Sequence, residues 1–279
     1  MKVGIIDVGG GLRDAFGAGV FDFLQDNKID IPVLVGISAG SANAINYMSK
    51  QRGRSLRFYT DYDLRKDAMS LRNYVKTGEY LNLDYLYRDL SVNGSEDPFD
   101  YDTFKKSKTK FYVVTTKAKD GKPKYFTNKD IKKDDYNVLS ASSCLPIMCK
   151  PRIIDGEEYF DGSISDPIPV NILRKENVDK IIIILTRPID FRKNDGKKKK
   201  IYKSLEKKYK EFTEVLLKRT ELYNDTLERI LKEKDDNILI LAPDSTKGLK
   251  TLTKDKEKIE KLYHEGYTKA EKIIDFIKC

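Results

Sequence analysis

One serine in the chain is flanked in the way that nucleophilic serines of acyl hydrolases are. The pentad Gly36-Ile37-Ser38-Ala39-Gly40 has the Gly-x-Ser-x-Gly pattern, and it lies between an apolar stretch and a stretch of small residues. A sharp strand-to-helix turn of this kind exposes the serine hydroxyl, and the flanking glycines tolerate the strained backbone. The positive end of the helix also faces negative charge that develops on a reacting carbonyl. The pentad predicts Ser38 as a nucleophile, with a simple packing turn as the structural alternative.

A second glycine-rich segment also follows an apolar stretch and opens a helical pattern. Its run is Gly9-Gly10-Gly11-Leu12-Arg13, and free backbone N–H groups in such a loop can bind negative charge. A dinucleotide-binding fingerprint would need a further glycine at position 14, where the chain has an aspartate. An oxyanion hole needs only two N–H groups near the reacting carbonyl. The run therefore favours an oxyanion hole over a nucleotide site.

The base that would activate Ser38 is less evident from the sequence. His264 is the only histidine, and its neighbours place it on the polar face of a terminal helix, where an exposed side chain is expected. Asp161 ends a short strand-like stretch before Gly162 and Ser163, where catalytic groups of α/β sheets often collect. Asp-Gly turns are also common without any catalytic role. Position alone leaves Asp161 one candidate among many carboxylates.

Taken together, the glycine run 9–13, the Ser38 pentad and the Asp161-Gly162 pair resemble the three motifs of the bacterial patatin-like phospholipase family. The order and the strand context are those of the family, and the resemblance extends over residues 2–190. It implies a lipid acyl hydrolase with a Ser-Asp dyad, in which Ser38 is the nucleophile, Asp161 the base and the glycine run the oxyanion loop. It also implies a lipid ester as substrate, an acyl-enzyme intermediate, and no metal or cofactor.

Two positions depart from the family pattern. Asp14 stands where a glycine usually follows the basic residue, and Ser163 stands where glycine or alanine usually follows Asp-Gly. We expect Asp14 to cap the following helix; its charge would oppose oxyanion formation if the side chain pointed inward. Two alternatives to the dyad remain open. One is a Ser-His-Asp esterase that uses His264, and the other is a non-catalytic acyl- or nucleotide-binding protein on the same fold.

Strands and helices must hold these residues in place. Short apolar runs alternate with helical patterns along the first two hundred residues, and this alternation is typical of an α/β fold. The resemblance specifies a three-layer sandwich with a mostly parallel central sheet and a helical carboxy-terminal extension. Strands are predicted at residues 2–8, 32–36, 111–116, 158–161, 179–185 and 238–241, and helices at 16–24, 39–49, 134–142 and 169–175.

The last third of the chain is rich in lysine and glutamate. Apolar spacing over residues 201–232 predicts one long amphipathic helix, and a second apolar stripe over 259–277 predicts a terminal helix. We therefore expect a catalytic α/β domain at residues 1–190 and a mainly helical segment at 191–279 that packs on the same domain.

Composition excludes several classes of protein. Hydrophobic residues make up 39% and charged residues 35% of the chain, which is typical of a folded, highly charged protein. No apolar run approaches the ~20 residues of a membrane span, and the start of the chain has no signal-peptide pattern. Three cysteines and one histidine make neither a disulfide framework nor a zinc site. We expect a cytoplasmic protein.

Net charge is +9, and much of it comes from lysines of the last third. This charge is compatible with peripheral contact with an anionic membrane surface, but a solvated loop and charged helix faces are the favoured explanation. No basic motif interleaved with aromatic residues is present, so no nucleic acid partner is expected. The expected partner is a lipid or ester substrate, and the sequence does not specify an oligomeric state.

Overall fold

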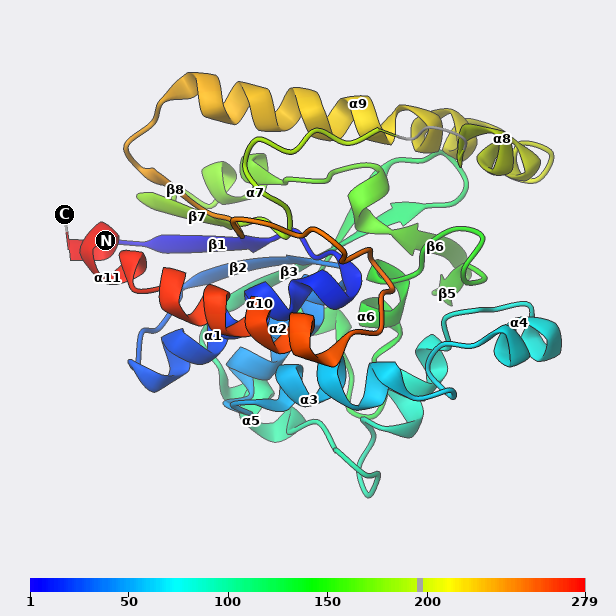
Figure 1. Cartoon of the computed structure of the whole chain (residues 1–279), viewed down its shortest axis with the longest axis horizontal. Coiled ribbons are helices and arrows are strands. Elements are labelled where there is room, and N and C mark those ends of the chain that lie inside the picture. The colour runs from blue at the N-terminus through cyan, green and yellow to red at the C-terminus, as the bar shows by residue number, and fades with distance from the viewer. Residues whose placement is uncertain (195–197, 279) are drawn as a thin grey trace.

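An eight-stranded sheet forms the centre of the molecule (Figure 1). The computed structural model describes residues 1–194 and 198–278. The sheet runs in the order β5-β6-β3-β2-β1-β7-β8, with β4 paired to β3 outside this order. The strands are β1 Val3–Asp7, β2 Val33–Ile37, β3 Lys110–Lys117, β4 Pro123–Thr127, β5 Arg152–Ile154, β6 Glu157–Asp161, β7 Lys180–Ile184 and β8 Ile238–Leu241.

The middle strands are apolar on both sides because helices cover both faces of the sheet. β1, β2, β7 and β8 pair with one another in parallel, and every residue of β1, β2 and β7 is buried. Consecutive side chains of a strand enter opposite faces, so Ile5 and Ile6 belong to two separate apolar clusters. Continuous burial of this kind is characteristic of parallel strands.

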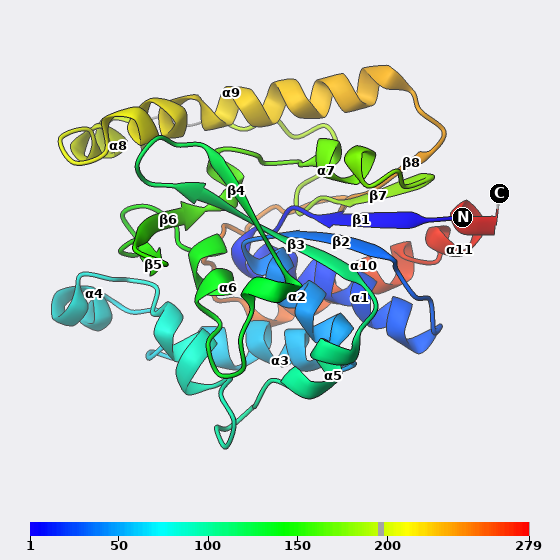
Figure 2. The same cartoon turned by 180° about the vertical axis from the view of Figure 1, so that it is seen from behind.

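Helices form the two outer layers. In both views α1, α2, α3 and α10 lie on one face of the sheet, and α7 and α9 lie on the other (Figures 1 and 2). The predicted three-layer α/β fold is therefore confirmed. The helices are α1 Ala15–Asp26, α2 Ala39–Met48, α3 Arg54–Thr60, α4 Leu71–Thr77, α5 Tyr101–Lys106, α6 Asn137–Ser142, α7 Val170–Lys175, α8 Lys198–Tyr202, α9 Lys210–Glu233, α10 Lys256–Lys269 and α11 Lys272–Lys278.

The long helix predicted at residues 201–232 is wrong in its first part. α8 ends at Tyr202, and α9 begins only at Lys210, after Tyr209 adopts a non-helical backbone with φ −134° and ψ 68°. The interruption places the Tyr209 ring 5.7 Å from the ring of Phe160, and Phe212 stacks on Phe160 at 4.7 Å. Because Phe160 precedes Asp161, this aromatic packing fixes the strand that carries the predicted base.

The terminal helix predicted at residues 259–277 is divided at Ala270 and Glu271 into α10 and α11. α10 packs tightly on α1, because a Cβ atom on Gly19 would lie 2.0 Å from the Tyr263 carbonyl oxygen. The last third thus supplies both β8 in the sheet and α10 beneath it. The division at residue 190 remains a prediction. None of the described helices has the length and apolarity of a bilayer-crossing segment.

Candidate active site

Ser38 occupies the turn between β2 and α2 in a strained backbone conformation. Its φ of 55° and ψ of −130° are rare for a residue with a side chain. Hydrogen bonds hold this turn from both sides. The Ser38 N–H donates to Ser142 Oγ at 2.8 Å, and the Ser38 carbonyl accepts from the Ser41 N–H and hydroxyl at 3.0 and 2.6 Å. The hydroxyl lines a cavity, as the sequence pattern predicts.

The small residues of the pentad allow α2 to pass close to the sheet. A Cβ atom on Gly40 would lie 2.5 Å from the Asp7 carbonyl oxygen, and one on Gly36 would lie 2.5 Å from Ser41 Cα. Ile37 is fully buried, and Ala39 lines the cavity beside Ser38. The pattern Gly-x-Ser-x-Gly is therefore required by packing at this turn, as well as by exposure of the serine.

Asp161 is brought to Ser38 by the pairing of β3. Within β3, Val114 pairs with Ile37 of β2, and the next residue, Thr115, pairs with Asp161 of β6. β4 pairs with the same stretch of β3 and so occupies its other edge. Hence β2 and β6 meet end to end along one edge of β3, and their ends carry Ser38 and Asp161.

Several hydrogen bonds orient the Asp161 carboxylate and its backbone. Oδ1 accepts from the Ser163 N–H at 2.8 Å, the carbonyl accepts from Thr116 Oγ1 at 2.8 Å, and the N–H donates to the Cys144 carbonyl at 2.9 Å. The bond at 2.8 Å uses the Ser163 backbone, and the Ser163 side chain, which departs from the family pattern, also lowers the pKa of the Asp161 carboxylate. Gly162 is required, because a Cβ atom there would lie 2.2 Å from the Val114 carbonyl oxygen.

Burial makes Asp161 a stronger base than an ordinary aspartate. Desolvation of the fully buried carboxylate raises its pKa, while hydrogen bonds from Ser163 and from the Ser38 hydroxyl, and the charge of Arg219, act in the opposite direction. The balance favours the protonated form more than in water. The Ser38 hydroxyl thus lies close enough to this carboxylate to lower its pKa.

The glycine loop presses against the Ser38 turn. Gly9 has φ 66°, and a Cβ atom on it would lie 2.1 Å from the Ile37 carbonyl oxygen and 3.0 Å from Ser38 Cβ. The Gly9 N–H donates to Asp7 Oδ1 at 3.1 Å, and the buried Leu12 donates its N–H to the Thr251 carbonyl at 2.9 Å. Between these two engaged amides lie two others.

The amides of Gly10 and Gly11 donate to no acceptor within residues 1–194 and 198–278. The Ala39 amide, at the first position of α2, is likewise without an acceptor in that part of the chain. Free N–H groups beside a serine hydroxyl can hold the oxygen of a tetrahedral intermediate. The predicted oxyanion loop is therefore placed next to the predicted nucleophile.

Beneath the loop lies a buried pair of carboxyl groups. Asn43 Nδ2 donates to Asp7 Oδ2 and to the Asp14 carbonyl, both at 3.1 Å, and Asn43 Oδ1 accepts from the Tyr59 hydroxyl at 3.0 Å. Burial raises the pKa of Asp7 to about 6 and that of Asp14 well above its ordinary value, and the Asp7 charge raises the Asp14 pKa further. One proton held by the pair would relieve the repulsion between the two buried carboxylates.

This pair corrects two expectations for Asp14. The residue occupies the cap position of α1, but its side chain makes no capping hydrogen bond. The side chain points inward, where burial and the Asp7 charge raise its pKa and so favour the neutral form, which would not oppose an oxyanion as a charge does. Instead the pair links β1 to α2 under the glycine loop.

Replacement of Asp14 by asparagine should flatten the dependence of stability on pH. Because the folded state raises the pKa of the pair, its stabilising contribution is complete at low pH and is lost as pH rises through these values, about 6 for Asp7. The introduced amide keeps a donor for Asp7 but cannot ionise. Urea unfolding at pH 5 and pH 8 measures the difference in the free energy of unfolding between the two pH values, and Asp30→Asn, at an exposed position, is the control. An unchanged difference between the two pH values in Asp14→Asn would contradict the shared proton.

Arg13 and Arg187 make one wall of the cavity positive. Arg13 is 7% exposed and donates from Nη1 to Thr251 Oγ1 at 3.0 Å, while its Nε has no partner among the described residues. Burial and the nearby Arg187 charge lower the Arg13 pKa to about 9. Arg187 donates to Thr246 Oγ1 at 2.8 Å. Among the described residues, neither guanidinium has a carboxylate within ion-pair distance, so their charge is available to an anion.

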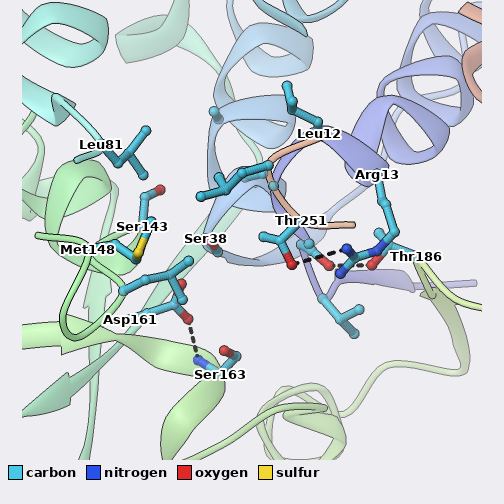
Figure 3. A pocket seen from close by; sticks show the side chains of 18 of the residues that line it. Leu12, Arg13, Ser38, Leu81, Ser143, Met148, Asp161, Ser163, Thr186 and Thr251 are labelled. Atoms are coloured by element: carbon cyan, nitrogen blue, oxygen red, sulfur yellow. Dashed lines mark hydrogen bonds between the residues drawn. The ribbon is translucent and has the colours of Figure 1, made fainter. Parts of the chain in front are cut away.

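Figure 3 shows Ser38 and Asp161 between two chemically different walls. Leu81 and Met148 lie on one side of Ser38, and Arg13, Thr186 and Thr251 lie on the other. The cavity measures about 510 Å³, which is a typical volume for a small-molecule site. Leu83, Leu86 and Phe99 extend the apolar wall. This geometry fits a molecule with an apolar end and an anionic end.

Some site residues could not be identified from the sequence, and one alternative fails. Ser142 and Thr251 hold the turn and the loop, but neither belongs to a recognisable spacing with the residues that it contacts. His264 is exposed, packs against the Tyr263 ring at 5.3 Å and lies outside the cavity lining. The His264 esterase is therefore contradicted. The described residues contain no cluster of three or more potential metal-ligating side chains.

Comparison with known proteins extends these observations. Residues 8–174 match the family described as patatin-like phospholipase, and residues 209–278 match a domain of unknown function, DUF6363. The uncharacterized protein YjjU of Escherichia coli is 28% identical over 192 residues, which cover 67% of this chain and 52% of YjjU. The putative patatin-like phospholipase domain-containing protein M110.7 of Caenorhabditis elegans is 25% identical over 192 residues, 65% of this chain and 16% of that protein.

The chain thus spans about half of one curated relative and a smaller part of the other. Among solved structures, VipD from Legionella pneumophila aligns with 98% of this chain and 67% of its own, at 12% identity and a TM-score of 0.48.

Proposed function

The chain belongs to the patatin-like phospholipase family, and from this premise we propose that it is a serine acyl hydrolase that cleaves carboxylic esters of lipids. The family itself supports a lipid acyl hydrolase. The finer proposal assigns Ser38 as the nucleophile and Asp161 as the base. Its main support is that β2 and β6 end at neighbouring positions of β3, beside the amides of Gly10 and Gly11.

In the proposed reaction the Asp161 carboxylate accepts the Ser38 proton while the Ser38 oxygen bonds to the ester carbonyl carbon. The N–H groups of Gly10 and Gly11, with the first amide of α2, stabilise the charge that develops on the carbonyl oxygen. The alcohol then leaves with the proton from Asp161, and the acyl group remains on Ser38. Asp161 next takes a proton from water as the water oxygen attacks the acyl carbon. The bond between the acyl carbon and the Ser38 oxygen then breaks, and Asp161 returns the proton to that oxygen, which releases the fatty acid and restores Ser38.

The two walls of the cavity suggest how a substrate lies. The acyl chain would contact the wall of Leu81, Leu83 and Met148, and a phosphate of the leaving alcohol would face Arg187. A guanidinium without a carboxylate partner binds phosphate through charge-assisted hydrogen bonds. The proposed substrates are therefore phospholipids or other lipid esters with an anionic headgroup.

Replacement of Arg187 by glutamine should discriminate between ester classes. A hydrogen bond to a charged group contributes roughly 1.5–3 kcal/mol, so kcat/KM for a phospholipid should fall about 10- to 100-fold. Turnover of a neutral short-chain ester should change little. Arg192→Gln is the matched control, because Arg192 pairs with Glu228 on the surface. Equal losses on both substrates would contradict a headgroup role for Arg187.

Activity should be lost on acidification (the acid limb of the pH profile) at a higher pH than an enzyme with an ordinary aspartate base would show. Asp161 must be ionised to act as a base, and burial raises its pKa above 3.8, so activity should be lost on acidification at a higher pH than that value. Because the Arg219 charge lowers this pKa, Arg219→Gln should move the limb to still higher pH. The measurement is kcat/KM for a soluble ester as a function of pH, with circular dichroism at each pH to check that the protein stays folded. A limb at or below pH 3.8 would contradict the assignment.

Release of fatty acid by the purified chain tests the proposed function. We expect hydrolysis of phospholipids and of neutral esters of short and long acyl chains, without added metal. A chain that binds these lipids but releases no acid from any of them would favour the alternative of a non-catalytic acyl-binding protein.

A further inference from the structure

A short helix next to the cavity presents apolar side chains to solvent. We propose that α4 docks the protein on an anionic phospholipid surface, with Leu71, Tyr74 and Val75 inserted among the lipids and basic residues beside them facing the headgroups. The inference rests on the proposed function, since it explains how a lipid that is held in a membrane would reach Ser38.

α4 is exposed in a way that no packing role explains. Leu71 is 74% exposed, Tyr74 49% and Val75 84%, and no residue of the helix is buried. In the described part of the chain, three of the seven exposed large apolar side chains thus belong to one helix of seven residues. Scattered exposed apolar residues are common, but a cluster marks an interaction surface.

The helix is held firmly at the cavity wall. Met69 and Leu81, on either side of it, form an antiparallel bridge, and both line the cavity. Ser70 caps the helix by accepting from the Asn73 N–H at 3.2 Å. The N–H of Leu81 donates to the Met148 carbonyl at 3.2 Å, which joins the stem to another cavity residue. α4 is therefore the tip of a fixed projection of the cavity wall.

The charges around α4 fit an anionic surface. Arg72 and Lys76 are exposed on the helix itself, and the exposed Lys66 lies shortly before it. The exposed Lys150 lies against its end, since a Cβ atom on Gly78 would be 3.4 Å from Lys150 Cε. Asp67 is the one exposed acidic residue in the segment 66–80, because Glu79 is buried. Apolar side chains flanked by basic ones are the pattern of interfacial membrane binding.

A second prominence lies at the same end of the molecule. In both views α4 and α8 project beyond the end of the sheet at which β1 and β2 finish, which is the end that carries Ser38 (Figures 1 and 2). On α8, Ile201 is 54% exposed, and the neighbouring Lys199 and Lys200 are exposed as well. Ile201 also lines the cavity, which therefore extends from the stem of α4 to α8. A bilayer is favoured over a protein partner, because it would contact both prominences and supply the substrate between them.

Vesicle binding by the full chain tests the proposal. The inactive Ser38→Ala variant should co-sediment with vesicles of phosphatidylcholine and phosphatidylserine and much less with phosphatidylcholine alone. The double change Leu71→Ser/Val75→Ser should weaken this binding about tenfold, and Arg72→Gln/Lys76→Gln should weaken it similarly and reduce its salt dependence. The control is Lys232→Gln/Lys272→Gln, which removes two exposed charges from α9 and α11 at the opposite end of the molecule.

Soluble substrates separate this proposal from the proposed function. With otherwise active chains, Leu71→Ser/Val75→Ser should retain turnover of a soluble short-chain ester and lose hydrolysis of vesicle lipid. Equal vesicle binding by this variant and the unchanged chain would overturn the docking role of α4, whatever the esterase activity. No binding to either kind of vesicle would overturn it as well. If the unchanged chain did not hydrolyse the soluble ester, that result would instead contradict the proposed function.

Discussion

Replacing Asp161 with asparagine is expected to lower kcat for a soluble ester by about 10⁴-fold while the protein stays folded. Asparagine keeps the shape of the side chain and can accept from the Ser163 N–H, but it cannot take the Ser38 proton at neutral pH. Because desolvation of the charged carboxylate is also removed, stability should be equal or higher. Initial rates with a soluble ester and thermal unfolding provide the two measurements.

Asp166→Asn is the matched control for this experiment. Asp166 follows the same turn, and burial raises its pKa as well. Its carboxylate accepts a hydrogen bond from the Tyr125 hydroxyl at 2.7 Å. It does not line the cavity. We expect Asp166→Asn to retain most of the activity. An inactive Asp166→Asn beside an active Asp161→Asn would reverse the assignment of the base.

Replacing Ser38 with alanine is expected to reduce kcat by about 10⁴- to 10⁶-fold, because no acyl-enzyme can form. Residual turnover would come from the oxyanion loop alone. Alanine must still adopt φ 55°, so a small loss of stability is expected and unfolding should be measured in parallel.

Ser143→Ala controls for loss of a hydroxyl in the same cavity. Ser143 Oγ and the Tyr87 hydroxyl are 2.8 Å apart, and both residues line the cavity. Ser143→Ala should retain activity within about tenfold, since it removes one neutral hydrogen bond. Comparable inactivation by Ser38→Ala and Ser143→Ala would show that the assay reports cavity packing instead of nucleophilic attack.

What could be predicted from the sequence depends on how local each feature is. The Ser38 turn is encoded within five consecutive residues, and the strand, turn and helix around it form as predicted. The parallel sheet and its buried strands follow from apolar runs that are equally local. The family resemblance, which is confirmed, rests on three such local motifs.

Features that depend on contacts between segments far apart in the sequence could not be predicted from local patterns. Asp161 could be selected only through the resemblance, because its position beside Ser38 arises from the register of β6 on β3. The raised pKa values of Asp7 and Asp14 depend on burial of both carboxyl groups against α2, which brings distant segments together. Thr251, which binds the glycine loop from the last third of the chain, has no local signature.

The interruption before α9 also arises from a contact between segments far apart in the sequence. Its amphipathic spacing continues through the break, yet packing of Tyr209 and Phe212 on Phe160 outweighs continuation of the helix. The lysine-rich segment suggested membrane contact by charge alone. The structure adds exposed apolar residues, of which Ile201 lies within that segment and three lie on α4, far from it in the sequence.

Covalent labelling with a fluorophosphonate tests the central claim most directly, because it requires an activated serine but no knowledge of the natural lipid. Mass spectrometry of the digested protein should locate the adduct on Ser38, and labelling should be absent in Ser38→Ala and strongly slowed in Asp161→Asn. An adduct on another serine, or labelling of Asp161→Asn at the rate of the unchanged protein, would contradict the Ser38–Asp161 dyad.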